Sequence, residues 1–76
     1  MADADLLVTI GANVRRLRKG RDLTQAQLAA RVGVCRSSVA NIETGRQGDI
    51  KVTLLAGFAD VLHADLPELL AGGGRA

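Results

Sequence analysis

The 76-residue sequence contains neither Trp nor Tyr, and Phe58 is its only aromatic residue. Its hydrophobic core must therefore be aliphatic, built from Leu, Val, Ile and Ala. There is a single cysteine, Cys35, and a single histidine, His63. An internal disulfide and a metal site of several cysteines are thus impossible, which fits a reducing compartment and predicts no metal and no cofactor.

A basic leader and long apolar runs are also missing. Met1 to Asp5 carries two acids and no base, and no apolar run is long enough to cross a membrane. Apolar residues make up 47% of the chain and the net charge is only +2, which argues against disorder. We expect one small cytoplasmic domain over residues 1–71, followed by a flexible glycine-rich tail over 72–76.

Positive charge is concentrated in the middle of the chain. Residues 15–46 hold eight Lys or Arg and two Asp or Glu, whereas residues 1–14 hold two acids and no base. Residues 47–76 hold four acids and two bases. This distribution is typical of a protein that turns one basic face toward a polyanion, although an ordinary solvated surface has the same signature.

Apolar periodicity is helical throughout and predicts an all-α fold of five helices. The first spans about 5–19 and ends at a turn containing Gly20 and Asp22, where aspartate tolerates a left-handed conformation. The third and fourth are predicted over 36–44 and 52–62. In the fourth helix, the residues expected to face inward are Val52, Leu55, Phe58, Ala59 and Leu62.

The second and fifth helices carry capping signals. Thr24 and Gln27 form a capping box, Leu23 and Leu28 are spaced as a hydrophobic staple, and Gly33 ends the second helix. In the fifth helix Asp65 is the cap, with Pro67 in the first turn and Glu68 completing a second capping box. Two short helices joined by a tight glycine-containing turn predict a helix-turn-helix over 24–44.

The predicted third helix offers side chains suited to reading bases. With Val39 and Ile42 inward, its outer face presents Arg36, Ser37, Ala40 and Asn41. In a major groove arginine can pair with guanine and asparagine with adenine, serine can bond to either, and alanine can touch a thymine methyl. Polar groups on an exposed helix face are common, so the preceding capped helix and tight turn are what favour DNA binding.

Phosphate contacts require donors at the groove edge. Gln25 occupies the first position of the second helix, where unpaired backbone N–H groups also point outward. Arg46, just after the third helix, is equally well interpreted as a solvated charge, and Thr44 and Gln47 are weaker candidates.

Two runs carry a family resemblance, LTQAQLAARVGV over 23–34 and RSSVANIETGR over 36–46. Together with the flanking segments 10–18 and 59–62, they resemble the Cro/phage-repressor (XRE) helix-turn-helix family over roughly residues 6–71. The resemblance implies a five-helix, lambda-repressor-like domain that binds operator DNA as a dimer. The sequence departs from the family at Cys35, where serine or threonine is frequent and where cysteine is a poor helix cap.

The resemblance also implies roles for individual residues. Gln25 would contact a phosphate, Arg36, Ser37 and Asn41 would occupy base-reading positions, and Arg18 with Glu43 would form an ion pair between the first and third helices. A dimer would use the surplus leucines of the fifth helix, Leu66, Leu69 and Leu70, which are otherwise expected to complete the monomer core.

The resulting hypothesis is a sequence-specific transcriptional regulator, a repressor that binds a pseudo-palindromic operator as a dimer. A restriction-modification controller and an antitoxin with a toxin partner remain open alternatives. A third alternative is a protein-interaction module without DNA binding, against which the basic middle of the chain argues. An enzyme is not expected, because no motif links His63 and Cys35 and no phosphate-binding loop follows a strand.

Overall fold

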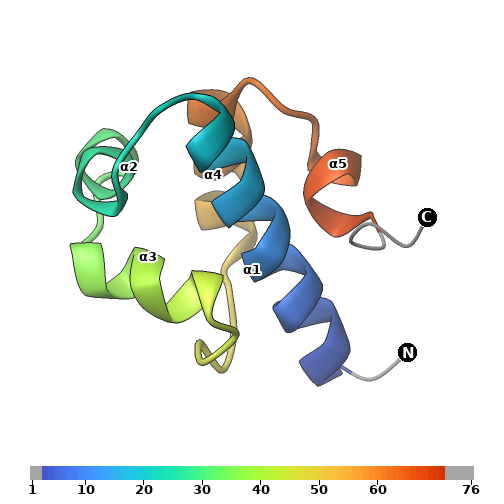
Figure 1. The fold of residues 1–76 in the computed structure, drawn as a ribbon. Coiled ribbons are helices and arrows are strands. Elements are labelled where there is room, and N and C mark those ends of the chain that lie inside the picture. The colour runs from blue at the N-terminus through green and yellow to red at the C-terminus, as the bar shows by residue number, and fades with distance from the viewer. Residues whose placement is uncertain (1–2, 72–76) are drawn as a thin grey trace.

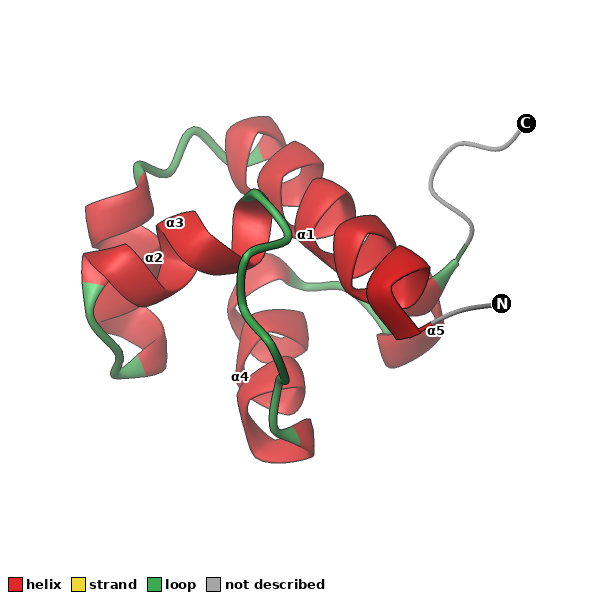
Figure 2. Ribbon diagram, turned by 90° about the horizontal axis from the view of Figure 1, so that it is seen from below, coloured by secondary structure: helices red, strands yellow, loops and turns green. Residues whose placement is uncertain are grey.

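The computed structural model describes residues 3–71, and in this part of the chain every regular element is a helix. The helices are α1 (Asp3–Gly20), α2 (Gln25–Val32), α3 (Arg36–Glu43), α4 (Val52–Leu62) and α5 (Leu66–Leu70). Figures 1 and 2 show α1 as the long central helix, with α2 and α3 on one side and α5 on the other. The predicted five-helix all-α fold is confirmed. The tail expected over 72–76 lies outside the described residues.

The α1–α2 turn and the start of α2 follow the local signals. Asp22 adopts the expected left-handed conformation, with φ of 57°. The N–H of Gln27 donates to Thr24 Oγ1 over 3.0 Å, and the N–H of Thr24 donates to Gln27 Oε1 over 2.8 Å. Leu23 and Leu28 are both buried, as the staple predicts. The start of α2 is therefore defined by residues adjacent to it in sequence.

The core is aliphatic around one aromatic ring. Phe58 is fully buried, and ten aliphatic side chains surround it: Ile10, Val14, Leu23, Leu28, Ala29, Val39, Ile42, Ile50, Leu62 and Leu69. The predicted inward position of Val52 is wrong, because 71% of this residue is exposed. The loop that precedes α4 inserts Ile50 into the core instead, and Val52 is exposed in the first turn of the helix.

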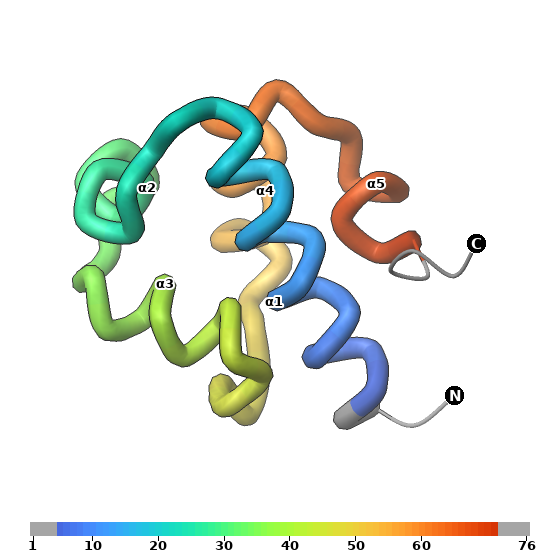
Figure 3. The backbone as a smooth tube through the Cα atoms, viewed as in Figure 1, coloured from blue at the N-terminus to red at the C-terminus, as the bar shows by residue number. Residues whose placement is uncertain are grey.

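A buried asparagine joins the first and last helices of the domain. The side-chain amide of Asn13, 2% exposed, donates to the carbonyls of Leu69 and Ala71 over 2.8 and 3.0 Å. These carbonyls stand at the end of α5, where helical carbonyls lack partners within the helix. Asn13 thereby fixes α5 to α1. The tube in Figure 3 shows these two helices side by side. No helix within residues 3–71 combines the length and apolarity required to cross a membrane.

Candidate nucleic-acid interface

The position of α3 is set by a short turn and two core side chains. Gly33 ends α2 with φ of 90°, a left-handed conformation that glycine adopts without steric cost. Its N–H and that of Val34 both donate to the carbonyl of Ala29. After this turn α3 begins at Arg36, and Val39 and Ile42 anchor its inner face in the core. The helix therefore lies across α2, with the opposite face toward solvent.

That outer face carries the residues expected from periodicity. Arg36, Ser37 and Asn41 are exposed, and Ala40 is half-buried. The first turns of α2 and α3 contain no Asp or Glu. Acidic residues are favoured at helix N-termini by the helix dipole, so their absence here leaves two positive helix ends without local compensation. Such a surface suits a polyanion.

The ion pair expected between Arg18 and Glu43 is confirmed. Arg18 Nε lies 2.6 Å from Glu43 Oε2, and Arg18 Nη2 donates to Oε1 over 3.0 Å, so the contact is bidentate. The two side chains are 10% and 2% exposed. Arg18 Nη1 also donates to the carbonyl of Leu23 over 2.7 Å. The pair neutralises the only acidic side chain of α3 and ties this helix to α1 and to the α1–α2 turn.

The ion pair continues into a chain of hydrogen bonds that the sequence did not predict. Gln25 Nε2 donates to Glu43 Oε1 over 3.1 Å, and Gln25 Oε1 accepts from Arg36 Nη1 over 3.0 Å. Arg18, Glu43, Gln25 and Arg36 are thus connected in that order, from the buried end of the ion pair to the exposed face. We call these four residues the polar relay. It holds the guanidinium of Arg36 at the junction of α2 and α3.

The phosphate candidates differ in the donors that they have available. Gln25 is half-buried and keeps one amide hydrogen that is not used within the relay. Arg46 is exposed directly after α3, where its N–H and that of Gln47 bond to the carbonyl of Asn41. The hydroxyl of Thr44 is directed at the carbonyls of Ala40 and Asn41, over 3.0 and 3.2 Å, which reduces its availability to a phosphate.

A close backbone approach between α1 and α3 was not anticipated. Gly11 is buried, and a Cβ at this position would overlap the carbonyl oxygen of Ile42 and crowd the carbonyl carbon of Glu43. Glycine is therefore required for α1 to reach the end of α3. The only sequence signal was one small residue between Ile10 and Val14 on the inward side of a predicted helix.

The remaining candidates are placed as follows. Leu69 is fully buried inside the monomer, so its predicted role in a dimer interface is wrong, whereas Leu66 and Leu70 are 37% and 42% exposed. Cys35 is the N-cap of α3 and makes no side-chain capping bond, as expected of cysteine. No group of three His, Cys, Asp or Glu side chains in the described part of the chain is arranged to hold a metal.

A five-helix domain with a helix-turn-helix, whose third helix turns polar side chains toward solvent, is typical of a class of nucleic-acid-binding domains. The model of the helix-turn-helix domain family matches residues 9–71. This chain belongs to that helix-turn-helix family.

Two curated relatives are each 34% identical to the chain. One is RghRB of Bacillus subtilis (strain 168), an uncharacterised HTH-type transcriptional regulator matched over 86% of this chain and 47% of its own length. The other, y4dJ of Sinorhizobium fredii, has the same description and is matched over 82% and 83%. The chain therefore spans about half the length of RghRB. Both relatives are regulators rather than enzymes.

Solved structures that are similar to this chain are also described as regulatory proteins. The restriction-modification controller protein C.AhdI from Aeromonas hydrophila is 32% identical, with a TM-score of 0.78 over 83% of this chain and 94% of that one. The clp gene regulator ClgR from Corynebacterium glutamicum is 29% identical, with a TM-score of 0.83 over 93% and 94%. The biofilm regulator SinR, solved in complex with DNA, is 28% identical, with a TM-score of 0.76 over 80% and 97%.

Proposed function

We propose that this chain is a cytoplasmic transcriptional repressor whose domain, residues 1–71, binds duplex DNA sequence-specifically through α3. The observation that carries the proposal is the division of α3 into two faces. Val39 and Ile42 are buried, while Arg36 and Asn41 are exposed, and the first turns of α2 and α3 contain no acidic residue. A major groove of B-DNA accepts one α-helix, and this is the arrangement with which it is read.

Sequence discrimination falls to the exposed side chains of α3. Arg36 is assigned to the O6 and N7 atoms of a guanine and Asn41 to the N6 and N7 atoms of an adenine, each worth roughly 1–3 kcal/mol of discrimination. Ser37 can donate or accept. Ala40, which is half-buried, offers its methyl group to a thymine. The polar relay supports this assignment, because it orders the longest of these side chains before DNA arrives.

Phosphate contacts position the helix without reading sequence. Gln25 has a spare amide hydrogen beside the unpaired N–H groups at the start of α2, and Arg46 stands at the other end of α3. Gln47 and Thr44 are secondary candidates. These contacts predict that affinity falls steeply with added salt, because each neutralised phosphate releases counterions.

A homodimer would place two copies of α3 in successive major grooves, ~34 Å apart, on a pseudo-palindromic operator. Exposed Leu66 and Leu70 support this part of the proposal. Leu70 borders an apolar groove that is also lined by Leu6, Leu7 and Ile50. Apolar surface of this kind on a small domain is suited to a second copy.

The test is selection of duplexes from a random library, followed by fluorescence anisotropy on the selected operator and its single-base variants. Arg36→Ala should relax specificity at one base pair. Gln25→Ala should weaken binding to every duplex and, through the relay, lower the discrimination due to Arg36. Arg15→Ala is the matched control, since it removes an exposed charge from α1. Binding without sequence preference would contradict a specific regulator, and no binding at low salt would favour a protein-interaction module.

A restriction-modification controller is a second candidate function. It is favoured by the likeness to C.AhdI, which is matched over 94% of its length and bears that description. A controller would bind DNA through the same α3 surface. An operator located upstream of a restriction or modification gene would support this candidate, whereas one located upstream of a toxin gene would support the antitoxin alternative.

A further inference from the structure

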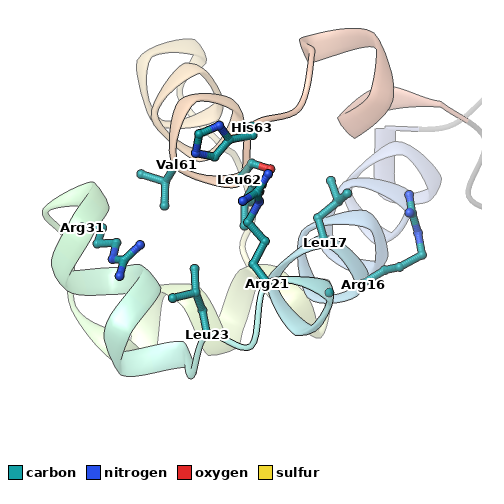
Figure 4. A pocket seen from close by; sticks show the side chains of 9 residues that line it. Arg16, Leu17, Arg21, Leu23, Arg31, Val61, Leu62 and His63 are labelled. Atoms are coloured by element: carbon teal, nitrogen blue, oxygen red, sulfur yellow. Dashed lines mark hydrogen bonds between the residues drawn. The ribbon is translucent and has the colours of Figure 1, made fainter.

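A second cationic surface lies away from α3. Figure 1 shows the α1–α2 turn and the C-terminal end of α4 at the opposite side of the molecule from α3. Together with α2 they border an open pocket of about 710 Å³. Its floor is apolar, and its rim carries Arg16, Arg21, Arg31 and His63. We call it the arginine pocket (Figure 4).

Arg21 is fixed at the rim of this pocket by a contact with the backbone of α4. Its Nε donates to the carbonyl of Leu62 over 3.0 Å, at the end of α4, where carbonyls lack helical partners. Figure 4 shows the side chain reaching from the α1–α2 turn toward Leu62. The two terminal nitrogens of Arg21 have no hydrogen-bond partner among the residues whose side chains the structure describes. The guanidinium is therefore held in place with most of its donors free.

Arg31 faces Arg21 from the other side of the pocket. It projects from α2 over the apolar side chains of Leu23 and Val61 (Figure 4). Within the described residues the ion pair of Arg18 and Glu43 is the only one, so no carboxylate pairs with Arg16, Arg21 or Arg31. Several positive charges around one hollow, none of them in an ion pair with a carboxylate, create a positive potential that attracts anions.

We propose that the arginine pocket binds a small organic phosphate, a phosphomonoester carried on an apolar body. The planar guanidinium groups of Arg21 and Arg31 match the oxygens of a phosphate, and several arginines match a dianion better than they match one carboxylate. The apolar floor, which includes Leu23 and Leu62, suits the remainder of such a ligand. The pocket is separate from the proposed DNA surface, so this inference stands independently of it.

The test uses 1-naphthyl phosphate as the probe and the ¹⁵N-labelled full chain. Titration followed by amide chemical shifts should give saturable changes at Gly20, Leu23 and His63 and none along α3. Inorganic phosphate lacks the apolar body and 1-naphthol lacks the charge. Each should bind at least about tenfold more weakly than the complete probe, since each loses one of the two contributions.

Charge-removing variants distinguish binding in the arginine pocket from an effect of the overall charge of the chain. Arg21→Gln with Arg31→Gln should lower probe affinity at least about tenfold, the loss expected for one charge-assisted contact or more. The matched control is Arg15→Gln with Lys19→Gln, which removes the same charge from exposed positions of α1 outside the pocket. The side chain of Arg31 makes no hydrogen bond to any described residue, so Arg31→Gln alone tests the site if loss of the Arg21 contact unfolds the chain.

Four results would overturn the proposal. They are shift changes confined to α3, an equal loss of affinity in the control pair, equal binding of 1-naphthol, and displacement of the probe by duplex DNA with the same dependence on Arg31. The first and last would assign the probe to the DNA surface. The second would reduce the effect to overall charge, and the third would leave only an apolar hollow.

Discussion

The two helices of the helix-turn-helix have the same length but begin in different ways. α2 and α3 each span eight residues. The start of α2 is closed by Thr24 and Gln27, which exchange hydrogen bonds, and by buried Leu23 and Leu28. The start of α3 has Cys35 in the same extended conformation, and no side-chain capping bond is made there. The start of α2 is thus specified by residues adjacent to it in the sequence, whereas the start of α3 is not.

What secures α3 comes from other elements. Val39 and Ile42 hold it against the core, and Glu43 at its last turn is bound by Arg18 of α1. Tertiary packing supplies most helix stability in proteins, and here it acts mainly on the C-terminal half of α3. This arrangement leaves the N-terminal half, with Arg36 and Ser37, exposed to a ligand.

The largest effect should follow loss of the ion pair. Glu43→Ala leaves the guanidinium of Arg18, a buried residue, without its carboxylate, and we expect about 3 kcal/mol lower free energy of unfolding. Urea denaturation followed by circular dichroism measures this change. Asp60→Ala is the control, because the Asp60 side chain is exposed and bonds to no described residue. Equal midpoints for the two variants would show that α3 does not depend on its tie to α1.

A methyl group at the α1–α3 contact should be nearly as damaging. Gly11→Ala places a Cβ against the Ile42 carbonyl, which as backbone cannot rotate away, so we expect a loss of about 2–3 kcal/mol. Gly20→Ala is the matched control, since a Cβ there meets nothing within 4 Å. Alanine in place of glycine in a helix should be neutral or slightly stabilising there. Thermal unfolding of both variants tests the contact, and a neutral Gly11→Ala would contradict it.

The close contact between Gly11 and the backbone of α3 could not be predicted from the sequence. Capping boxes, a glycine terminator and helical periodicity depend on residues within one turn of each other, and these predicted the bounds of α2 and α4 and the outward face of α3. The ion pair of Arg18 with Glu43 was accessible only through family resemblance, because 25 residues separate its partners. The small residue at position 11 does not by itself indicate that the backbone of another helix approaches it.

The two wrong predictions, for Val52 and Leu69, also result from contacts between segments that are distant in the sequence. Val52 follows the apolar spacing of α4, but the path of the preceding loop inserts Ile50 and leaves Val52 exposed. Leu69 lies on an apolar helix face like Leu70, and only the docking of α5 by Asn13 decides which of the two is buried. The hydrogen bonds of Gln25 to Glu43 and Arg36 depend on the angle between α2 and α3. Each of these features is a property of the assembled domain.

Removing the local cap should have a smaller effect than either tertiary change. Thr24→Ala deletes the acceptor for the N–H of Gln27, and a lost N-cap costs ~1 kcal/mol. Thr53→Ala is the matched control, because Thr53 is an exposed residue inside α4 without a capping role. Urea midpoints of the two variants measure the difference. A loss from Thr24→Ala as large as that from Glu43→Ala would reverse the ranking of local and tertiary support.

The smallest effect should come from giving α3 the cap that it lacks. Cys35 has φ of −76° and ψ of 151°, the extended geometry in which a serine oxygen accepts from the N–H three residues later. Cys35→Ser should therefore raise the free energy of unfolding by about 0.5–1 kcal/mol, and Cys35→Ala, which removes the thiol without adding an acceptor, is its control. Equal stability of the two variants would mean that Val39, Ile42 and Glu43 already fix the first turn of α3, so that a local cap there has nothing left to stabilise.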